Sequence, residues 1–287
     1  MKNFKIKSYC KINLFLNVIK KLKNGYHSIE SLITFCDLHD VIKISKIVNR
    51  KDKISFSGKF KKNIDKNLNT ITKLLDLLRK NKYLTDQFFK IDVQKNIPHG
   101  SGLGGGSSNA ANILNFLNSK MKLKIRKNNI NKLAAQIGFD VPINLERENT
   151  FLTGKNNQII RINKKYKLNL LIVYPNLICS TKKIYNKNKK IGFSKSKSFL
   201  RVEKKVKLIN LLIKQSNDLQ DTVVKIYPEI KKIINYIKSQ QGCYFSRITG
   251  SGSACIGIFT NMKSTIYAQK LIKIRYPNYW CVTSKTI

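Results

Sequence analysis

The sequence predicts an α+β fold organised in two domains. Helical and strand-like patterns mix along the chain without a βαβα repeat, which argues against a parallel α/β architecture. The chain has 287 residues, of which 42% are apolar, enough for one large or two moderate hydrophobic cores. We expect two domains, spanning residues 1–162 and 163–287.

The first third of the chain predicts several strands. Residues 4–9 and 12–19 are strand-like, and residues 20–25 form a polar turn between the second of them and the next strand. Two further strands are expected over residues 29–35 and 41–44. A lysine-rich loop then leads to the first helix.

Apolar residues spaced by three and four positions predict three helices. The first covers residues 70–80, and the second starts after a glycine-rich segment that itself follows a strand over residues 89–93. The third runs from residue 129 to Gly138, a residue type that often follows a helix end. The faces expected to be buried are Ile71, Leu74, Leu75 and Leu78, then Ala110, Ile113, Leu114 and Leu117, then Ile130, Leu133, Ala134 and Ile137.

The glycine-rich segment Ile97–Ala111 reads IPHGSGLGGGSSNAA. Glycines leave the backbone open to close approach by a polyanion, and the segment joins a strand to a helix N-terminus. Free N–H groups and the positive end of the helix dipole converge there, which favours phosphate. Ser107 or Ser108 is expected to cap the helix. A glycine-rich turn that serves only backbone geometry is the alternative.

Two familiar phosphate loops do not match this segment. A P-loop needs a lysine after its last glycine, and none follows Gly105 or Gly106. A dinucleotide fingerprint needs an acidic residue at the end of a following strand, and none is placed there.

The segment instead resembles the phosphate-binding motif of the GHMP small-molecule kinases. The resemblance implies a first domain like ribosomal protein S5 domain 2, a second that is ferredoxin-like, and ATP as co-substrate. It assigns ATP binding to Pro98, His99, Gly100, Ser101, Gly102, Leu103, Gly104, Gly105, Gly106, Ser107 and Ser108.

Lys11 and Asn13 lie in the phrase KINLFL. Taken alone, such residues beside a strand are usually solvated. The phrase is similar to the amino-terminal signature of the GHMP kinases that act on a cytidine-diphosphate alcohol. By that resemblance Lys11 is catalytic and Asn13 contacts the substrate.

Tyr26 and His27 follow an Asn-Gly turn and are similar to the G-Y-H motif of the same kinases. The resemblance implies that Tyr26 stacks on the cytosine ring and that His27 reads its edge, roles suited to a phenol ring and an imidazole. Tyr185, in a loop after a strand over residues 168–174, is the candidate for a second aromatic contact. The alternative is that none of the three binds a ligand: Tyr26 would be half-buried, His27 would have its hydrogen bonds satisfied within the protein, and Tyr185 would lie on the surface.

Asp140 lies in GFDVP, after the third helix. Pro142 is expected to push Val141 toward an extended conformation and so to fix where the aspartate emerges. A lone aspartate there is more often solvated, but the G-x-D-V-P pattern resembles the GHMP segment that carries the catalytic aspartate. Phe139 replaces the usual alanine, and Ile143-Asn144 replaces a commonly aromatic pair.

The remaining residues predict a hairpin over 151–161 and two strands, 244–248 and 254–259, around Thr249–Ser253. That junction resembles the third GHMP motif, although it also fits a plain glycine-rich turn. A helix over residues 262–274 should place Tyr267, Leu271 and Ile274 on one side, and a strand over 280–283 should end the fold.

The implied reaction transfers the γ-phosphoryl of ATP to the 2-hydroxyl of 4-diphosphocytidyl-2-C-methyl-D-erythritol, a step of the non-mevalonate route to isopentenyl diphosphate. Asp140 would accept the hydroxyl proton, and Lys11 would favour the ionised carboxylate and offset charge on the phosphoryl group. Mg²⁺ is expected with ATP, touching Ser107 or Ser108, while no side-chain metal site can be named. A GHMP kinase for another alcohol and an inactive relative are the rivals.

The amino-acid composition limits which binding partners are plausible. The net charge of +41 would ordinarily suggest nucleic acid, but the lysines are spread evenly and are not interleaved with stacking aromatics. We therefore expect no specific nucleic-acid partner, with a basic RNA-binding protein as the remaining alternative. Six scattered cysteines without a C-x-x-C pair favour buried thiols in a cytoplasmic protein. We expect no membrane span, and a monomer or weak homodimer.

Overall fold

The computed structural model describes residues 3–23, 25–65, 67–154, 158–189, 191 and 196–287. By its internal contacts the chain separates into two compact units, each assembled from several segments. Unit 1 comprises Met1–Lys11, Leu38–His99 and Gly104–Arg147, and unit 2 comprises Ile12–Asp37, Gly100–Leu103 and Glu148–Ile287. The predicted α+β class is confirmed. The predicted domain division after residue 162 stays a prediction.

The sheet of unit 1 is built around the long strand β3. β3 spans His27–Ile47, and its residues 41–47 pair antiparallel with β5 (Phe88–Gln94). β4 (Lys53–Ser57) pairs parallel with β5, and β1 (Phe4–Asn13) pairs with β3. The alternating burial of β5 places Phe89, Ile91 and Val93 on one face of this sheet.

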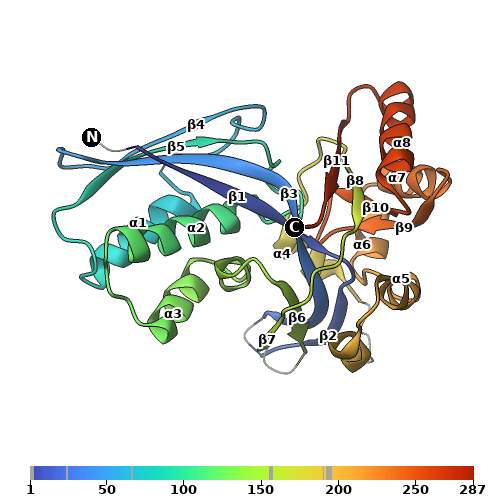
Figure 1. The fold of residues 1–287 in the computed structure, drawn as a ribbon, viewed down its shortest axis with the longest axis horizontal. Helices are drawn as coiled ribbons and strands as arrows, with labels where there is room; N and C mark the ends of the chain where they lie inside the picture. The colour runs from blue at the N-terminus through green and yellow to red at the C-terminus, as the bar shows by residue number, and fades with distance from the viewer. Residues whose placement is uncertain (1–2, 24, 66, 155–157, 190, 192–195) are drawn as a thin grey trace. The chain divides into compact units, whose positions relative to one another are not determined.

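Two helices cover that face, and a third packs against both of them (Figure 1). α1 spans Thr70–Lys80, as predicted at both ends, and α2 spans Gly105–Lys120. All eight residues predicted to form the apolar faces of these two helices are buried. α3 spans Lys127–Ile137 and so starts two residues earlier than expected. The core of unit 1 therefore lies between one sheet face and α1, α2 and α3.

Strand β3 is continuous where the sequence predicted two separate strands. The acidic residues Asp37 and Asp40 interrupt the apolar pattern between the two predicted strands. Both carboxylates are satisfied inside the fold, because Asp37 accepts from the Ser284 hydroxyl and Asp40 pairs with Lys95. Asp40 is buried and Asp37 is half-buried, and acidic side chains whose oxygens are hydrogen-bonded in this way can continue a strand.

The segment after α3 also differs from the prediction. Val141, expected to be extended, has helical dihedrals (φ −67°, ψ −42°) and precedes the 3₁₀ helix η1, Pro142–Leu145. The Val141 N–H donates to the Gly138 carbonyl at 3.0 Å, which closes a turn before the proline. Pro142 takes the first position of η1, where its missing N–H is tolerated. The turn outweighs the local preference of a residue that precedes proline.

In unit 2, the first part of β3 is extended into a sheet by three further strands. β2 (Asn17–Lys21) and β6 (Asn149–Thr153) both pair antiparallel with β3. β7 (Gln158–Ile162) pairs antiparallel with β6, so the predicted hairpin is confirmed.

A second, four-stranded antiparallel sheet completes unit 2, in the order β11-β8-β10-β9. These strands span Trp280–Lys285, Asn169–Tyr174, Cys255–Phe259 and Cys243–Ile248. α7 (Glu229–Lys238) packs against β9 and β10, and α8 (Met262–Arg275) packs against β8 and β11 (Figure 1). With its helices this is the strand order of a ferredoxin-like βαββαβ unit.

The other helical segments of unit 2 are short. They are α4 (Thr181–Lys187), η2 (Ser196–Arg201), α5 (Lys205–Ile213) and α6 (Gln220–Ile226). Tyr185 therefore lies on a helix, capped by the Ser180 side chain, and the predicted loop is wrong. A serine directly before this turn supplies the missing acceptor for its N–H groups.

The predicted face of α8 is also wrong. The helix buries Thr265, Ala268 and Ile272, whereas Tyr267 and Ile274 are 57% and 77% exposed. Apolar residues occur around the whole circumference of this helix, so spacing alone does not select the buried side.

The six cysteines are all free thiols, and five of them are buried. In the part of the chain that the structure describes, no helix is both long and apolar enough to cross a membrane.

Candidate active site

The start of α2, in unit 1, has a backbone geometry that favours an anion. Gly104 is the N-cap in a left-handed conformation (φ 70°), and the helix has no side-chain cap. The predicted capping by Ser107 or Ser108 is therefore wrong. The first intrahelical bond runs from the Ser108 N–H to the Gly104 carbonyl at 2.9 Å. The amides before Ser108 thus lie outside the helical ladder, at the positive end of the helix dipole.

The two serines differ in what their hydroxyls can reach. Ser108 is buried, donates to the Tyr9 carbonyl at 2.7 Å and accepts from the Ser8 hydroxyl at 2.9 Å. Both of these hydrogen bonds are made to residues of strand β1. Ser107 is half-buried in the first turn of α2. Of the two, Ser107 is the better placed for an anion or a metal ion.

Lys11 and Asp140 meet beside this helix start. The Lys11 Nζ lies 3.3 Å from the Asp140 Oδ2, and the two side chains are 5% and 36% exposed. The stem of Lys11 packs against Gly104, since a Cβ added at Gly104 would lie 2.7 Å from the lysine Cγ. A buried cation, a partly exposed carboxylate and free helix amides therefore share one corner of unit 1.

Asn144 holds the backbone that carries the aspartate. Its side-chain amide donates to the Asp140 carbonyl at 2.6 Å, and the residue is 2% exposed. Its own Oδ1 is buried without a hydrogen-bond partner. Phe139, by contrast, is 44% exposed and contributes little to the core. In the sequence, Asn144 was noted only because it departs from the family pattern, and its contact with Asp140 was not predicted.

Gly100–Leu103 of the glycine segment belong to unit 2 and pack against the Thr249–Ser253 junction. Gly102 has φ 82°, and a Cβ there would lie 2.1 Å from the Thr249 carbonyl oxygen. The Thr249 hydroxyl accepts from the Asn13 N–H at 2.8 Å. The Asn13 amide group donates to the Ser31 hydroxyl at 2.8 Å, and Asn13 is buried. Only a glycine permits this approach of the segment to Thr249.

The other residues predicted for ATP binding lie along the same segment. The Ser101 carbonyl accepts from the Ala254 N–H at 3.0 Å, and the Gly100 carbonyl from the Cys179 N–H at 3.2 Å. The buried members are Pro98, Ser101, Leu103, Gly105 and Ser108, and those at least partly exposed are His99, Gly100, Gly102, Gly104, Gly106 and Ser107.

An aromatic pair lies elsewhere in unit 2. The rings of His27 and Tyr185 are 5.1 Å apart at an angle of 35°. Tyr26 is 61% exposed, unusual for so large a side chain. Burial, together with the charge of Lys21, lowers the pKa of His27 below its usual 6.5. The imidazole is therefore neutral at neutral pH, with one ring nitrogen able to accept a hydrogen bond. Asn24, which opens the predicted turn, lies outside the described residues.

No dedicated side-chain metal centre exists among the described residues. They contain no group of three or more histidines, cysteines, aspartates and glutamates that could hold a metal ion.

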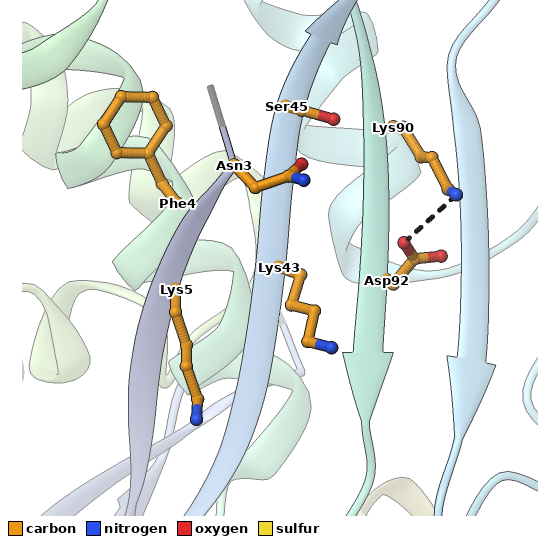
Figure 2. Close-up of a pocket in the computed structure, with 7 residues that line it drawn as sticks. All are labelled: Asn3, Phe4, Lys5, Lys43, Ser45, Lys90 and Asp92. Atoms are coloured by element: carbon orange, nitrogen blue, oxygen red, sulfur yellow. Dashed lines mark ion pairs between the residues drawn. The ribbon is translucent and has the colours of Figure 1, made fainter. Parts of the chain in front are cut away.

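A basic depression of about 380 Å³ on the sheet of unit 1 contains none of the predicted site residues (Figure 2). Lys5 and Lys43 line it, from β1 and β3, and Lys90 pairs with Asp92 across 3.8 Å. Lys43 alternates with the buried Ile42 and Ile44, so it points away from the helices. The depression reflects the general excess of surface lysine.

Sequence reasoning missed one charged cluster behind the glycine segment. Asp40, Lys95 and Asn109 are all at most 2% exposed and are joined by hydrogen bonds. Aspartate and lysine side chains are usually solvated, so only the pairing of Asp40 with Lys95 in space reveals this cluster.

The fold and this corner of unit 1 together define a GHMP kinase. Residues 69–145 match the family model of the GHMP kinases N terminal domain, and residues 197–274 match that of the GHMP kinases C terminal domain. The first match contains the start of α2 and Asp140, and the second contains Thr249.

Full-length relatives narrow this class. The chain is 42% identical over 287 residues to the 4-diphosphocytidyl-2-C-methyl-D-erythritol kinase of Pelagibacter ubique (strain HTCC1062), with 100% of both chains covered. It is 32% identical to that of Wolbachia pipientis wMel, again with 100% of both chains covered. The chain belongs to the 4-diphosphocytidyl-2-C-methyl-D-erythritol kinase family of GHMP kinases.

A solved structure supports the fold. The crystal structure of a 4-(cytidine 5'-diphospho)-2C-methyl-D-erythritol kinase superposes with a TM-score of 0.75 at 21% identity, covering 98% of this chain and 99% of that chain. Membership in this family does not favour the alternative of a basic RNA-binding protein.

Proposed function

We propose that this kinase transfers the γ-phosphoryl group of ATP to the 2-hydroxyl of 4-diphosphocytidyl-2-C-methyl-D-erythritol. The products are the 2-phosphate and ADP, in the non-mevalonate route to isopentenyl diphosphate. The observation that carries the proposal is the 3.3 Å ion pair of Lys11 and Asp140 against Gly104. The 42% identical relative over the full chain supports the choice of substrate.

Asp140 is the proton acceptor in this proposal. Its carboxylate is partly exposed, so a substrate hydroxyl can reach it, and the backbone beneath it is held by Asn144. As the hydroxyl attacks, its proton passes to the carboxylate. The Lys11 ammonium stays beside the same point, where it offsets the negative charge of the phosphoryl group in transit.

The glycine segment holds the triphosphate. Gly104, Gly105 and Gly106 place no side chain over the backbone N–H groups at the start of α2. Phosphoryl transfer depends mostly on positioning and charge stabilisation, so a rigid set of amides supplies much of what is needed.

Mg²⁺ accompanies ATP in this proposal. An ion that arrives with a nucleotide would need few protein ligands, so the lack of a carboxylate cluster in the described residues is compatible with it. Its role is to neutralise charge on the β- and γ-phosphates. The half-buried Ser107 hydroxyl is the protein group that would reach it.

Tyr26, His27 and Tyr185 recognise the cytosine. The exposed Tyr26 ring offers a stacking surface, and the neutral His27 offers a hydrogen-bond acceptor to the base amine. Tyr185, 5.1 Å from His27, restricts the imidazole orientation. Asn13, which is held by its bonds to Thr249 and Ser31, is a further substrate contact in this proposal.

The proposal also covers the cellular compartment and the oligomeric state. We propose that the enzyme works in the cytoplasm, where its free thiols stay reduced, and that it is a monomer or weak homodimer. Light scattering across a concentration series measures the latter.

A panel of alcohols tests the substrate. Release of ADP is measured with ATP, Mg²⁺ and one acceptor at a time: the cytidine-diphosphate alcohol, mevalonate, homoserine or galactose. We expect turnover with the first alone. Faster turnover with any of the others would show that the enzyme is a GHMP kinase for a different alcohol.

A further inference from the structure

Asp40 lies at the centre of a buried hydrogen-bond cluster behind the glycine segment, in unit 1. It is fully buried, and its carboxylate accepts from four donors. The Oδ1 accepts from the backbone N–H groups of Asn96 and Ile97 at 2.8 and 2.9 Å. The Oδ2 accepts from the Lys95 ammonium and, at 3.0 Å, from the Asn109 amide.

These donors come from both sides of the glycine segment. Asn96 and Ile97 lie where the chain leaves β5, and Asn109 lies in the second turn of α2. The Asp40 carboxylate therefore links the start of the glycine segment to its end through hydrogen bonds. Four donors also compensate the cost of burying a charge, which a single ion pair would not do.

Lys95 brings a cation directly beneath the helix start. A Cβ added at Gly105 would lie 3.3 Å from the Lys95 Nζ and 2.9 Å from the Ile97 Cγ2. Gly105 does not have a positive φ, so close packing rather than backbone conformation is what calls for glycine here. The ammonium thus lies close to the first residue of α2, where the free amides and the helix dipole already favour an anion.

We propose that Asp40, Lys95 and Asn109 form a positioning cluster that fixes the glycine segment for a nucleoside triphosphate, with the Lys95 ammonium adding to the attraction for its phosphates. This inference rests on the proposed function, because it concerns the ATP site of the same kinase. None of the three touches a reacting atom. They act through the backbone from Asn96 to Ser108.

Three variants probe the cluster: Lys95→Met, Asp40→Asn and Asn109→Ala. The third should fold most easily, because it loses one hydrogen bond but also removes the Asn109 Oδ1, which is buried without a partner. The matched control is Arg79→Met, which breaks another ion pair of unit 1, Arg79–Asp52 at 2.9 Å. That pair joins α1 to the chain before β4 and has no link to the glycine segment.

Calorimetric titration with ATP, without acceptor alcohol, measures affinity independently of turnover. We expect Lys95→Met to weaken ATP binding about tenfold, and Asn109→Ala severalfold, with the KM for the alcohol unchanged. Arg79→Met should lower the melting temperature and leave ATP affinity unchanged. The weakening should be smaller at high salt for Lys95→Met, because a charge is lost.

Two results would overturn the inference. If Asn109→Ala and Lys95→Met bind ATP as tightly as Arg79→Met does, the cluster is structural only. If the wild type itself binds no ATP, the proposed function and this inference fail together. If the wild type binds ATP but phosphorylates no cytidine-diphosphate alcohol, the titrations still decide the role of the cluster.

Discussion

The Lys11 Nζ lies 3.3 Å from the Asp140 Oδ2, although 129 positions separate the two residues in the sequence. The pair combines an almost fully buried ammonium with a carboxylate that a substrate can reach. This arrangement supplies proton acceptance and charge stabilisation at one point. Its consequences can be tested one residue at a time.

Lys11→Met should lower kcat about a hundredfold or more, because the migrating phosphoryl loses its nearest cation while the apolar stem is retained. The KM for the alcohol should change little. Lys127→Met is a control, since Lys127 pairs with Glu146 at 3.4 Å but is 82% exposed. Steady-state kinetics of both variants check the prediction, and equal losses in the two would contradict it.

Gly104→Ala should destabilise the fold by about 1–3 kcal/mol and displace Lys11. The residue has φ 70°, and an added Cβ would lie 2.7 Å from the lysine Cγ. Gly106→Ala is the matched change, because its nearest neighbour, the Thr70 Oγ1, would lie 3.5 Å away and its φ is not positive. It should be neutral or stabilising by up to about 1 kcal/mol. Urea unfolding of both variants decides, and a larger loss for Gly106→Ala would refute the packing argument.

Asn144→Ala should lower kcat about three- to tenfold by releasing the Asp140 backbone, which its amide holds at 2.6 Å. The effect should vanish in the Asp140→Asn background, because the amide acts through the aspartate. A double-mutant cycle on kcat measures this coupling. Additive effects of the two substitutions would show that Asn144 only supports the fold.

The KM for the cytidine-diphosphate alcohol should stay constant as the pH falls from 8 to about 6.5 and rise only below that. The reason is that the pKa of His27 is lowered in the folded protein, mainly by burial, so protonation removes the acceptor only at more acidic pH. For the same reason, any contribution of His27 to stability is lost as the pH falls, not as it rises. His27→Gln should flatten the profile. A KM that changes between pH 8 and 7 through His27 would contradict the assignment.

The thiols should react slowly in the native protein. Burial raises the pKa of Cys179 and of Cys243 to about 11 and that of Cys281 to about 12. At pH 8 only about a thousandth or less of each is thiolate. Labelling with a disulfide reagent should be slow until denaturant exposes all six cysteines. Rapid native labelling of these three would show that they are less buried than described.

Local patterns predicted the regular elements where one face alone is buried. Helix 70–80 has a single apolar stripe and was predicted at both ends, whereas α8 is apolar on several sides and its buried face was not. The continuity of β3 depends on where Asp40 finds its partners, which are 55 to 69 positions away. Spacing cannot supply such distant pairings.

The residues of the candidate site also fall into two groups: those that local sequence patterns predict and those that they do not. The glycine segment is recognisable because its chemistry lies within a few consecutive residues, as does the GFDVP turn. The capping serines were misassigned because Gly104 itself takes the left-handed cap and Ser108 turns to β1. Lys95 and Asn144 carry no signal in sequence, since what marks them is burial and the backbone atoms that they contact.

Single-turnover phosphoryl transfer from ATP to the cytidine-diphosphate alcohol, compared between the wild type and Asp140→Asn, tests the central claim most directly. The account predicts a rate at least about a hundredfold lower for the variant, with ATP bound as tightly as before. An unchanged rate in Asp140→Asn would contradict it, because the carboxylate at residue 140 would then not be the proton acceptor.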